Sequence, residues 1–100
     1  HFPGHGSSLD DSHEGFVDIT NTWSEEELEP YNILIKEKKV KMIMTAHVFN
    51  AKLDEKYPAT LSYKINTKLL REKMAYDGVI ISDDLQMKAI SNNYVLKDTV

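Results

Sequence analysis

Two short apolar segments, each followed by polar residues, constrain the fold of this chain more than any other feature. Residues 40–46 (VKMIMTA) and 79–81 (VII) have the length and β-branched content of buried strands. Apolar residues at helical spacing over 62–74 lie between them, with Ser62 as the expected cap. A strand, a helix and a second strand predict parallel pairing through a crossover, and therefore an α/β fold with its chemistry at the carboxyl ends of the strands.

The remaining elements follow from local signals. Residues 1–23 hold three of the four histidines and three of the four glycines without a sustained period, which predicts a long loop. Ser24 and Glu27 have capping-box spacing, so a helix is expected to begin there, and Pro30 predicts a second helical start. A further helix is expected over residues 85–92. We expect the whole to be cut from a longer protein.

Composition excludes several classes of function. Twelve basic and sixteen acidic residues give a net charge of −4, and neither sign forms a run of five or six residues, so no nucleic-acid partner is expected. Every apolar stretch is far shorter than the roughly 20 residues of a membrane-spanning helix. The lack of cysteine excludes disulfides and thiolate metal sites. We expect a cytoplasmic location, and the question of an export signal stays open.

The first candidate site lies in the loop HFPGHGSSLDDSH. Asp11 stands two residues before His13, so in an extended segment its carboxylate reaches the imidazole and prepares a general acid and base. The alternative for this pair is ordinary turn chemistry. His1, His5 and His13 also raise the alternative of a metal-dependent hydrolase, which loss of activity with a chelator would favour. Their spacing matches no established metal motif, so no metal is expected.

A second candidate site follows the second predicted strand. Asp83 and Asp84 suit a nucleophile that attacks an anomeric carbon, and strand alternation lets only one of them face a pocket. Spacing alone does not say which, and Asp84 has the alternative of capping the next helix. His47 follows the first strand, either as a substrate-binding residue or as a hydrogen-bonded residue behind the site.

The segments HFPGHG, DSH, MTAHV, PATLS and LLREKMAYDGVIISDDLQM occur in the order found in glycoside hydrolase family 3. Over nearly its whole length the chain resembles the N-terminal barrel domain of the bacterial β-N-acetylglucosaminidase branch. The resemblance implies a (β/α)₈ TIM barrel, which takes about 250 residues. Residues 1–100 would be one partial catalytic domain, from the loop after strand 5 through strand 7 to the start of the next helix. The remainder of the barrel would be missing.

The resemblance also implies roles for individual residues. His13 would be the acid/base in a dyad with Asp11, Asp83 the nucleophile, and His1 a ligand of the sugar hydroxyls; no cofactor is implied. The expected function is retaining release of terminal β-linked N-acetylglucosamine from a carbohydrate substrate, in peptidoglycan turnover or recycling. A β-glucosidase-type activity is the alternative, although such relatives lack the Asp-x-His dyad. A muropeptide, a chitooligosaccharide or another glycoside stays open as substrate, and water or phosphate as acceptor.

Overall fold

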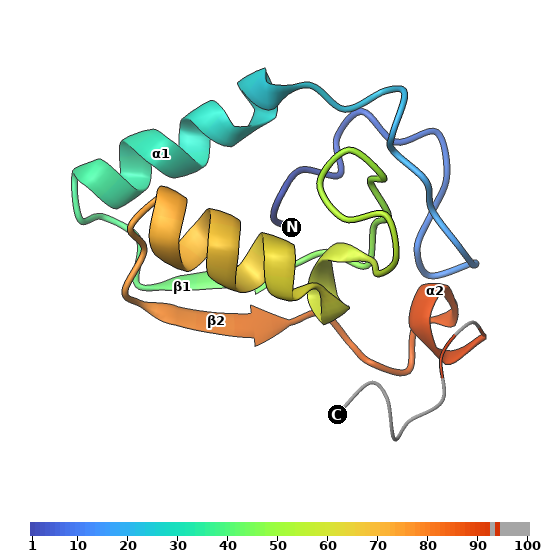
Figure 1. The fold of residues 1–100 in the computed structure, drawn as a ribbon. Helices are drawn as coiled ribbons and strands as arrows, with labels where there is room; N and C mark the ends of the chain where they lie inside the picture. Colours follow the sequence, from blue (N-terminus) through green and yellow to red (C-terminus); the bar gives the residue numbers. More distant parts are fainter. Residues whose placement is uncertain (93, 95–100) are drawn as a thin grey trace.

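The structure, a computed structural model, describes residues 1–92 and 94, and it forms a small α/β unit (Figure 1). Its elements, in chain order, are η1 (Glu25–Leu28), α1 (Glu29–Lys36), β1 (Met42–Thr45), η2 (Ala59–Leu61), η3 (Lys64–Lys73), β2 (Val79–Ser82) and α2 (Lys88–Ser91). Within the described residues, no helix is long and apolar enough to cross a membrane.

The two strands pair in parallel, as predicted. The register runs from Met42 opposite Val79 to Thr45 opposite Ser82. Phe2 adds a parallel bridge on the other side of β1, because its N–H donates to the Met44 carbonyl (2.8 Å) and its carbonyl accepts from the Ala46 N–H (2.8 Å). Three segments of the chain therefore end side by side at one edge of the sheet.

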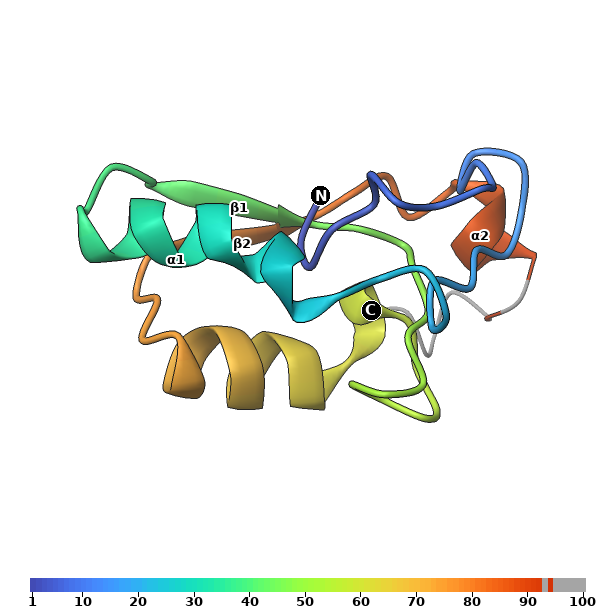
Figure 2. The ribbon, with the colours of Figure 1, turned by 90° about the horizontal axis from the view of Figure 1, so that it is seen from above.

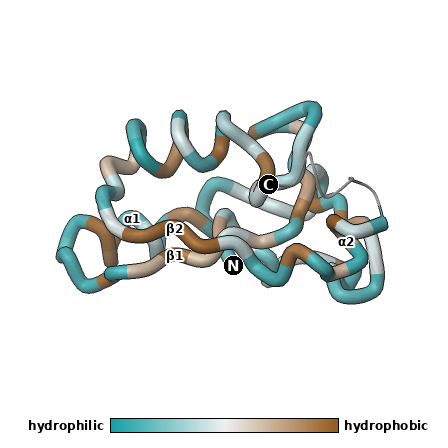
Figure 3. The backbone as a smooth tube through the Cα atoms, turned by 90° about the horizontal axis from the view of Figure 1, so that it is seen from below, coloured by the Kyte–Doolittle hydropathy of each residue, from teal (hydrophilic) through white to brown (hydrophobic). Residues whose placement is uncertain are grey.

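The core lies between the sheet and helices α1 and η3, which cover one face of the sheet (Figure 2). Ile43 is buried, Ile80 packs against the core, and Ile65 and Leu70 of η3 are fully buried beneath them. The opposite face is apolar but open, with Val79 52% exposed (Figure 3). The expectation that residues 79–81 form a buried strand is therefore wrong for this unit, since helices cover only one face of β2.

Local hydrogen bonds explain where the helices begin. The Ser24 N–H donates to Glu27 Oε2 (3.2 Å), which is half of the predicted capping box, and Pro30 occupies the first turn of α1. Ser62 Oγ accepts from the Ile65 N–H (3.0 Å) and caps η3 as predicted. Periodicity identified the buried face of η3, but not the wide π-type hydrogen bonding along it. Of the predicted helix over 85–92, only α2 forms.

The open apolar face predicts that residues 1–100, expressed alone, associate with one another. Val79 and Met42 are more than half exposed on it, and burial of such a face is favourable. Val79→Lys should lower self-association in sedimentation velocity. Leu9→Lys is the matched control, because Leu9 is 90% exposed but lies in the first loop. A wild-type segment that stays monomeric and unfolds cooperatively would contradict the prediction.

Candidate active site

The Asp83 carboxylate lies at the carboxyl edge of the sheet, directly after β2. Its Oδ1 accepts from the Asp84 N–H (2.8 Å), and its Oδ2 lies 3.2 Å from His1 Nε2. The Asp83 N–H continues the strand ladder to the Thr45 carbonyl (3.2 Å). The side chain is 16% exposed, so this carboxylate is held at both oxygens while part of it stays accessible. Residues from three segments of the chain thus determine its position.

Strand alternation separates the two neighbouring aspartates. Asp83 continues the series of Val79 and Ile81, which belong to the open face of the sheet. Asp84 belongs to the other series, and its Oδ1 accepts from the Gln86 N–H (2.9 Å) in the turn before α2. Its side chain therefore stabilises the turn before α2 and does not cap the helix itself, whose N-cap is Met87, so the capping alternative for Asp84 is wrong in this detail. Of the two aspartates, Asp83 is therefore the one that lies on the open face of the sheet, beside His1.

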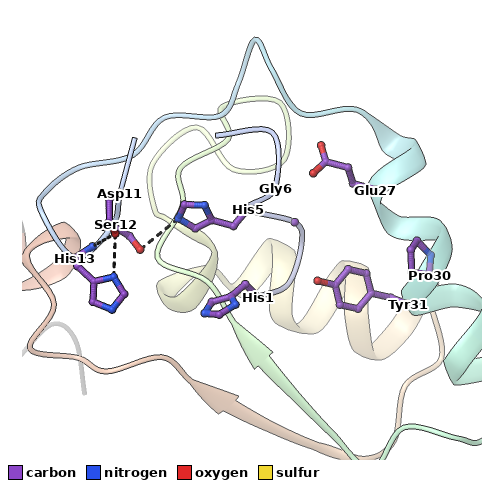
Figure 4. Close-up of a pocket in the computed structure, with 10 residues that line it drawn as sticks. His1, His5, Gly6, Asp11, Ser12, His13, Glu27, Pro30 and Tyr31 are labelled. Atoms are coloured by element: carbon purple, nitrogen blue, oxygen red, sulfur yellow. Dashed lines mark hydrogen bonds and ion pairs between the residues drawn. The ribbon is translucent and has the colours of Figure 1, made fainter. Parts of the chain in front are cut away.

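Asp11 and His13 form a compact pair in the first loop (Figure 4). Asp11 Oδ1 lies 2.9 Å from both the backbone nitrogen and the ring Nδ1 of His13. The hydrogen bond to Asp11 raises the pKa of His13, and the more distant Asp83 carboxylate acts in the same direction. The backbone and ring hydrogen bonds from His13 lower the pKa of Asp11. The pair therefore favours a protonated imidazole beside an ionised carboxylate, which suits a general acid.

Two further contacts hold this loop in place. His5 Nε2 lies 3.3 Å from Ser12 Oγ, and the Ser12 carbonyl accepts from the Ala89 N–H of α2 (3.1 Å). Ser12 is buried although its neighbours Asp11 and His13 are exposed. The Asp11–His13 pair is thereby attached to α2, the helix that follows Asp83 in the chain.

Glu27 in η1 holds the other end of the loop. Its Oε2 accepts from Ser7 Oγ (3.0 Å), and it lies against Gly4. Gly4 has a φ of 131°, and a Cβ there would stand 2.8 Å from Glu27 Oε1, so only glycine fits. The capping-box spacing identified Glu27 as a helix-start residue, whereas its contact with the loop carried no sequence signal.

A cavity of about 660 Å³ opens between the first loop and α1 (Figure 4). Its lining combines loop residues with residues of η1 and the start of α1: His1, Gly4, His5, Gly6, Asp11, Ser12, His13, Glu27, Pro30 and Tyr31. Asp83 is not in the lining, but His1 contacts it from the cavity side. The structure thus brings together four of the five predicted site residues, namely His1, Asp11, His13 and Asp83.

His47 does not line this cavity. It is 1% exposed, with Nδ1 2.7 Å from Thr60 Oγ1 and Nε2 2.7 Å from the Asp84 carbonyl oxygen. Both ring nitrogens are therefore engaged by protein groups. This placement corrects the expectation of a substrate-binding His47 and matches the alternative of a hydrogen-bonded residue behind the site.

Among residues 1–92 and 94, no three histidine, aspartate or glutamate side chains gather closely enough to hold a metal ion. His5 is bonded to Ser12 and His13 to Asp11, so these rings face separate partners. The histidine, aspartate and glutamate side chains of the described residues therefore do not form a site for a resident metal ion.

Parallel strands with histidines and a carboxylate at their carboxyl edge place this unit among the α/β proteins whose sites lie in the loops after the strands. The chain belongs to glycosyl hydrolase family 3, because the family model described as Glycosyl hydrolase family 3 N terminal domain matches residues 1–100. The resemblance predicted from the sequence motifs is thereby confirmed.

Named relatives agree with this assignment. Beta-hexosaminidase A of Pseudoalteromonas piscicida is 38% identical over 92% of this chain and 18% of its own length. Zinc-bound CbsA from Thermotoga neapolitana is 40% identical, with a TM-score of 0.91 over 99% of this chain and 22% of its own. The beta-N-acetylglucosaminidase from Thermotoga maritima is 42% identical, with a TM-score of 0.82 over the same shares. The chain therefore spans less than a quarter of the length of each of these three relatives.

The pairing of Asp11 with His13 predicts an observable titration. In the full-length protein that contains these residues, Asp11→Asn should lower the pKa of His13 toward the ordinary histidine value of about 6.5, because the charged acceptor that stabilises the imidazolium is lost. NMR titration of the His13 ring protons measures this shift. Asp10→Asn removes a neighbouring carboxylate and is the control. An unchanged His13 titration in Asp11→Asn would contradict the pairing.

Proposed function

We propose that this chain is the part of a retaining β-N-acetylglucosaminidase barrel that carries both the nucleophile and the acid/base. The observation that supports this most directly is the placement of Asp83 and of the Asp11–His13 pair on loops at the same edge of one parallel sheet. A β-glucosidase-type enzyme of the same family would share the carboxylate at the position of Asp83. The Asp–His pair favours the hexosaminidase, as do the names of the relatives.

The proposed reaction has two steps. Asp83 attacks the anomeric carbon, the glycosidic C–O bond breaks, and the leaving oxygen takes the proton of His13. In the second step neutral His13 accepts a proton from water, the water oxygen bonds to the anomeric carbon, and the Asp83 carboxylate is released. The raised pKa of His13 keeps the first-step acid protonated. After donating its proton the ring is neutral, so it places no second anion beside Asp83.

In this proposal the strands have definite positions in the barrel. The Phe2 bridge marks the end of strand 5, β1 is strand 6 and β2 is strand 7. The open apolar face of β1 and β2 would turn toward the barrel interior, where side chains from alternate strands form packed layers. His1, at the end of strand 5, is positioned to bind sugar hydroxyls while it contacts Asp83.

The proposed substrate is a carbohydrate with a terminal β-linked N-acetylglucosamine, such as a muropeptide or chitooligosaccharide, and the proposed setting is cytoplasmic peptidoglycan recycling. The zinc-bound structure of the Thermotoga neapolitana relative raises a metal-dependent hydrolase as the second candidate. The described histidines, which face separate partners, favour the metal-independent reaction.

The nucleophile assignment predicts a covalent intermediate on Asp83. In the full-length protein, a slow 5-fluoro N-acetylglucosaminyl donor should add one sugar mass, and peptide mapping should place it within residues 78–88. Asp83→Asn should abolish labelling and lower turnover by orders of magnitude. Asp84→Asn is the matched control, because it removes the adjacent carboxylate, which caps a turn, and should keep labelling. Label found on Asp84 would overturn the assignment. Absence of any label while the donor occupies the site would also overturn it, because it would indicate attack by the substrate's own acetamido oxygen.

The acid/base assignment predicts a dependence on the leaving group. His13→Ala should slow aryl N-acetyl-β-glucosaminides with poor leaving groups far more than those with good ones, because only the poor leaving groups need a proton in the transition state. Steady-state kcat/KM across an aryl series measures the effect. His5→Ala is the control, since its ring contacts Ser12 and is not assigned proton transfer. Equal losses across the series would remove His13 from this role.

A further inference from the structure

His47 is the most buried titratable group of the unit, and the two-step reaction makes no use of it. It follows β1, whereas its two partners come from other parts of the chain: Thr60 from η2, and Asp84 from the turn after β2. A carbonyl oxygen only accepts hydrogen bonds, so the contact with the Asp84 carbonyl requires a hydrogen on Nε2. The Thr60 hydroxyl stands at the opposite nitrogen, and its Oγ1 also lies 2.9 Å from the Ala46 carbonyl.

These contacts form a chain of hydrogen bonds that ends at Asp83. Thr60 bonds to His47, and His47 bonds to the Asp84 carbonyl (2.7 Å). The N–H of the same Asp84 donates to Asp83 Oδ1 (2.8 Å). The Asp84 backbone is therefore held by His47 on one side, and it holds the carboxylate on the other. The Met87 N–H also donates to the Asp84 carbonyl (3.1 Å), so loss of the His47 contact would remove one of the two hydrogen bonds that fix this carbonyl and would loosen the turn that orients Asp83 toward His1.

We propose that His47 is a positioning residue, which fixes the turn at Asp84 through Nε2 and thereby orients the Asp83 carboxylate for attack. The inference rests on the proposed function, because it assigns the nucleophile to Asp83. Thr60 acts with His47 by fixing the orientation of the ring. Neither residue touches the sugar, so their loss should slow the chemical step and leave substrate binding largely unchanged.

The chain offers an informative pair of substitutions at position 47. A glutamine amide extends as far as the imidazole Nε2 and can still donate to the Asp84 carbonyl. An asparagine amide is shorter and reaches only the position of Nδ1, on the Thr60 side. Both substitutions remove the ring, so they differ mainly in the contact that the proposal makes decisive.

The experiment measures the rate of covalent labelling by the 5-fluoro donor, with kcat, KM and the melting temperature, in the full-length protein. His47→Asn should slow labelling and lower kcat by about 100-fold, the size of effect known for small misplacements of reacting groups, with KM within about threefold of wild type. His47→Gln should recover about tenfold of that loss. His47→Asn that labels at the wild-type rate would overturn the proposal, as would equal rates for the two variants.

Two further comparisons separate positioning from general stability. Ser62→Ala removes a buried hydrogen bond to Asp54 (2.6 Å) in the same region without touching the turn at Asp84, so it should lower the melting temperature and keep the labelling rate. A loss of labelling in Ser62→Ala as large as in His47→Asn would overturn the proposal. If His47→Asn does not fold, the labelling rates of Thr60→Val and Thr60→Ser test the proposal instead, because only serine keeps the hydroxyl that contacts His47. Equal labelling rates for these two variants would overturn the proposal.

Failure of the proposed function gives a different result. Wild-type protein labelled outside residues 78–88 would overturn the Asp83 assignment, and with it the role of His47. Wild-type protein labelled on Asp83, with His47→Asn labelled equally fast, would overturn the role of His47 alone.

Discussion

Parallel pairing is the constraint on which the rest of the structure depends. Parallel strands present their carboxyl ends at one edge, so pairing of β1 with β2 and with Phe2 places Asp83 beside His1 and the Asp84 backbone beside His47. The hydrogen bonds of the site extend this pairing, since the Asp83 N–H still bonds to the Thr45 carbonyl beyond the end of the strand. The burial of Ile65 and Leu70 beneath one face stabilises the sheet, and it thereby indirectly stabilises the edge.

The charges at this edge are arranged in complementary pairs. Asp83 faces His1, and Asp11 faces His13, so each carboxylate has a ring that can carry a proton. Glycosidases that use two carboxylates place two anions on either side of one bond and raise the pKa of one of them. In the mechanism proposed for this chain, the proton donor His13 is stabilised instead by Asp11, a partner in its own loop. The two pairs come from separate elements, and α2 connects them through the Ser12 carbonyl.

The sequence allowed prediction of those features that depend on neighbouring residues or on regular periods. The strand order, the capping roles of Ser62 and Glu27 and the Asp11–His13 pair all follow from spacings of three residues or fewer, or from a clear period. It could not predict contacts between distant segments, such as His47 with Asp84 or Glu27 with Ser7, because no local pattern encodes them. The exposure of Val79 also escaped prediction, since an apolar strand looks the same whether or not a neighbour covers it.

The self-contained geometry of the Asp11–His13 pair has a consequence for evolution and engineering. The carboxylate and the imidazole lie two residues apart and bond through a single oxygen, so three consecutive residues complete the unit. Such a unit can be inserted, moved or deleted with its loop while the strand that carries Asp83 stays intact. A graft of this loop onto another sheet would therefore need to preserve only the anchors of the loop, such as the Ser12 carbonyl that accepts from α2, because the Asp11–His13 pair needs no partner from outside the loop.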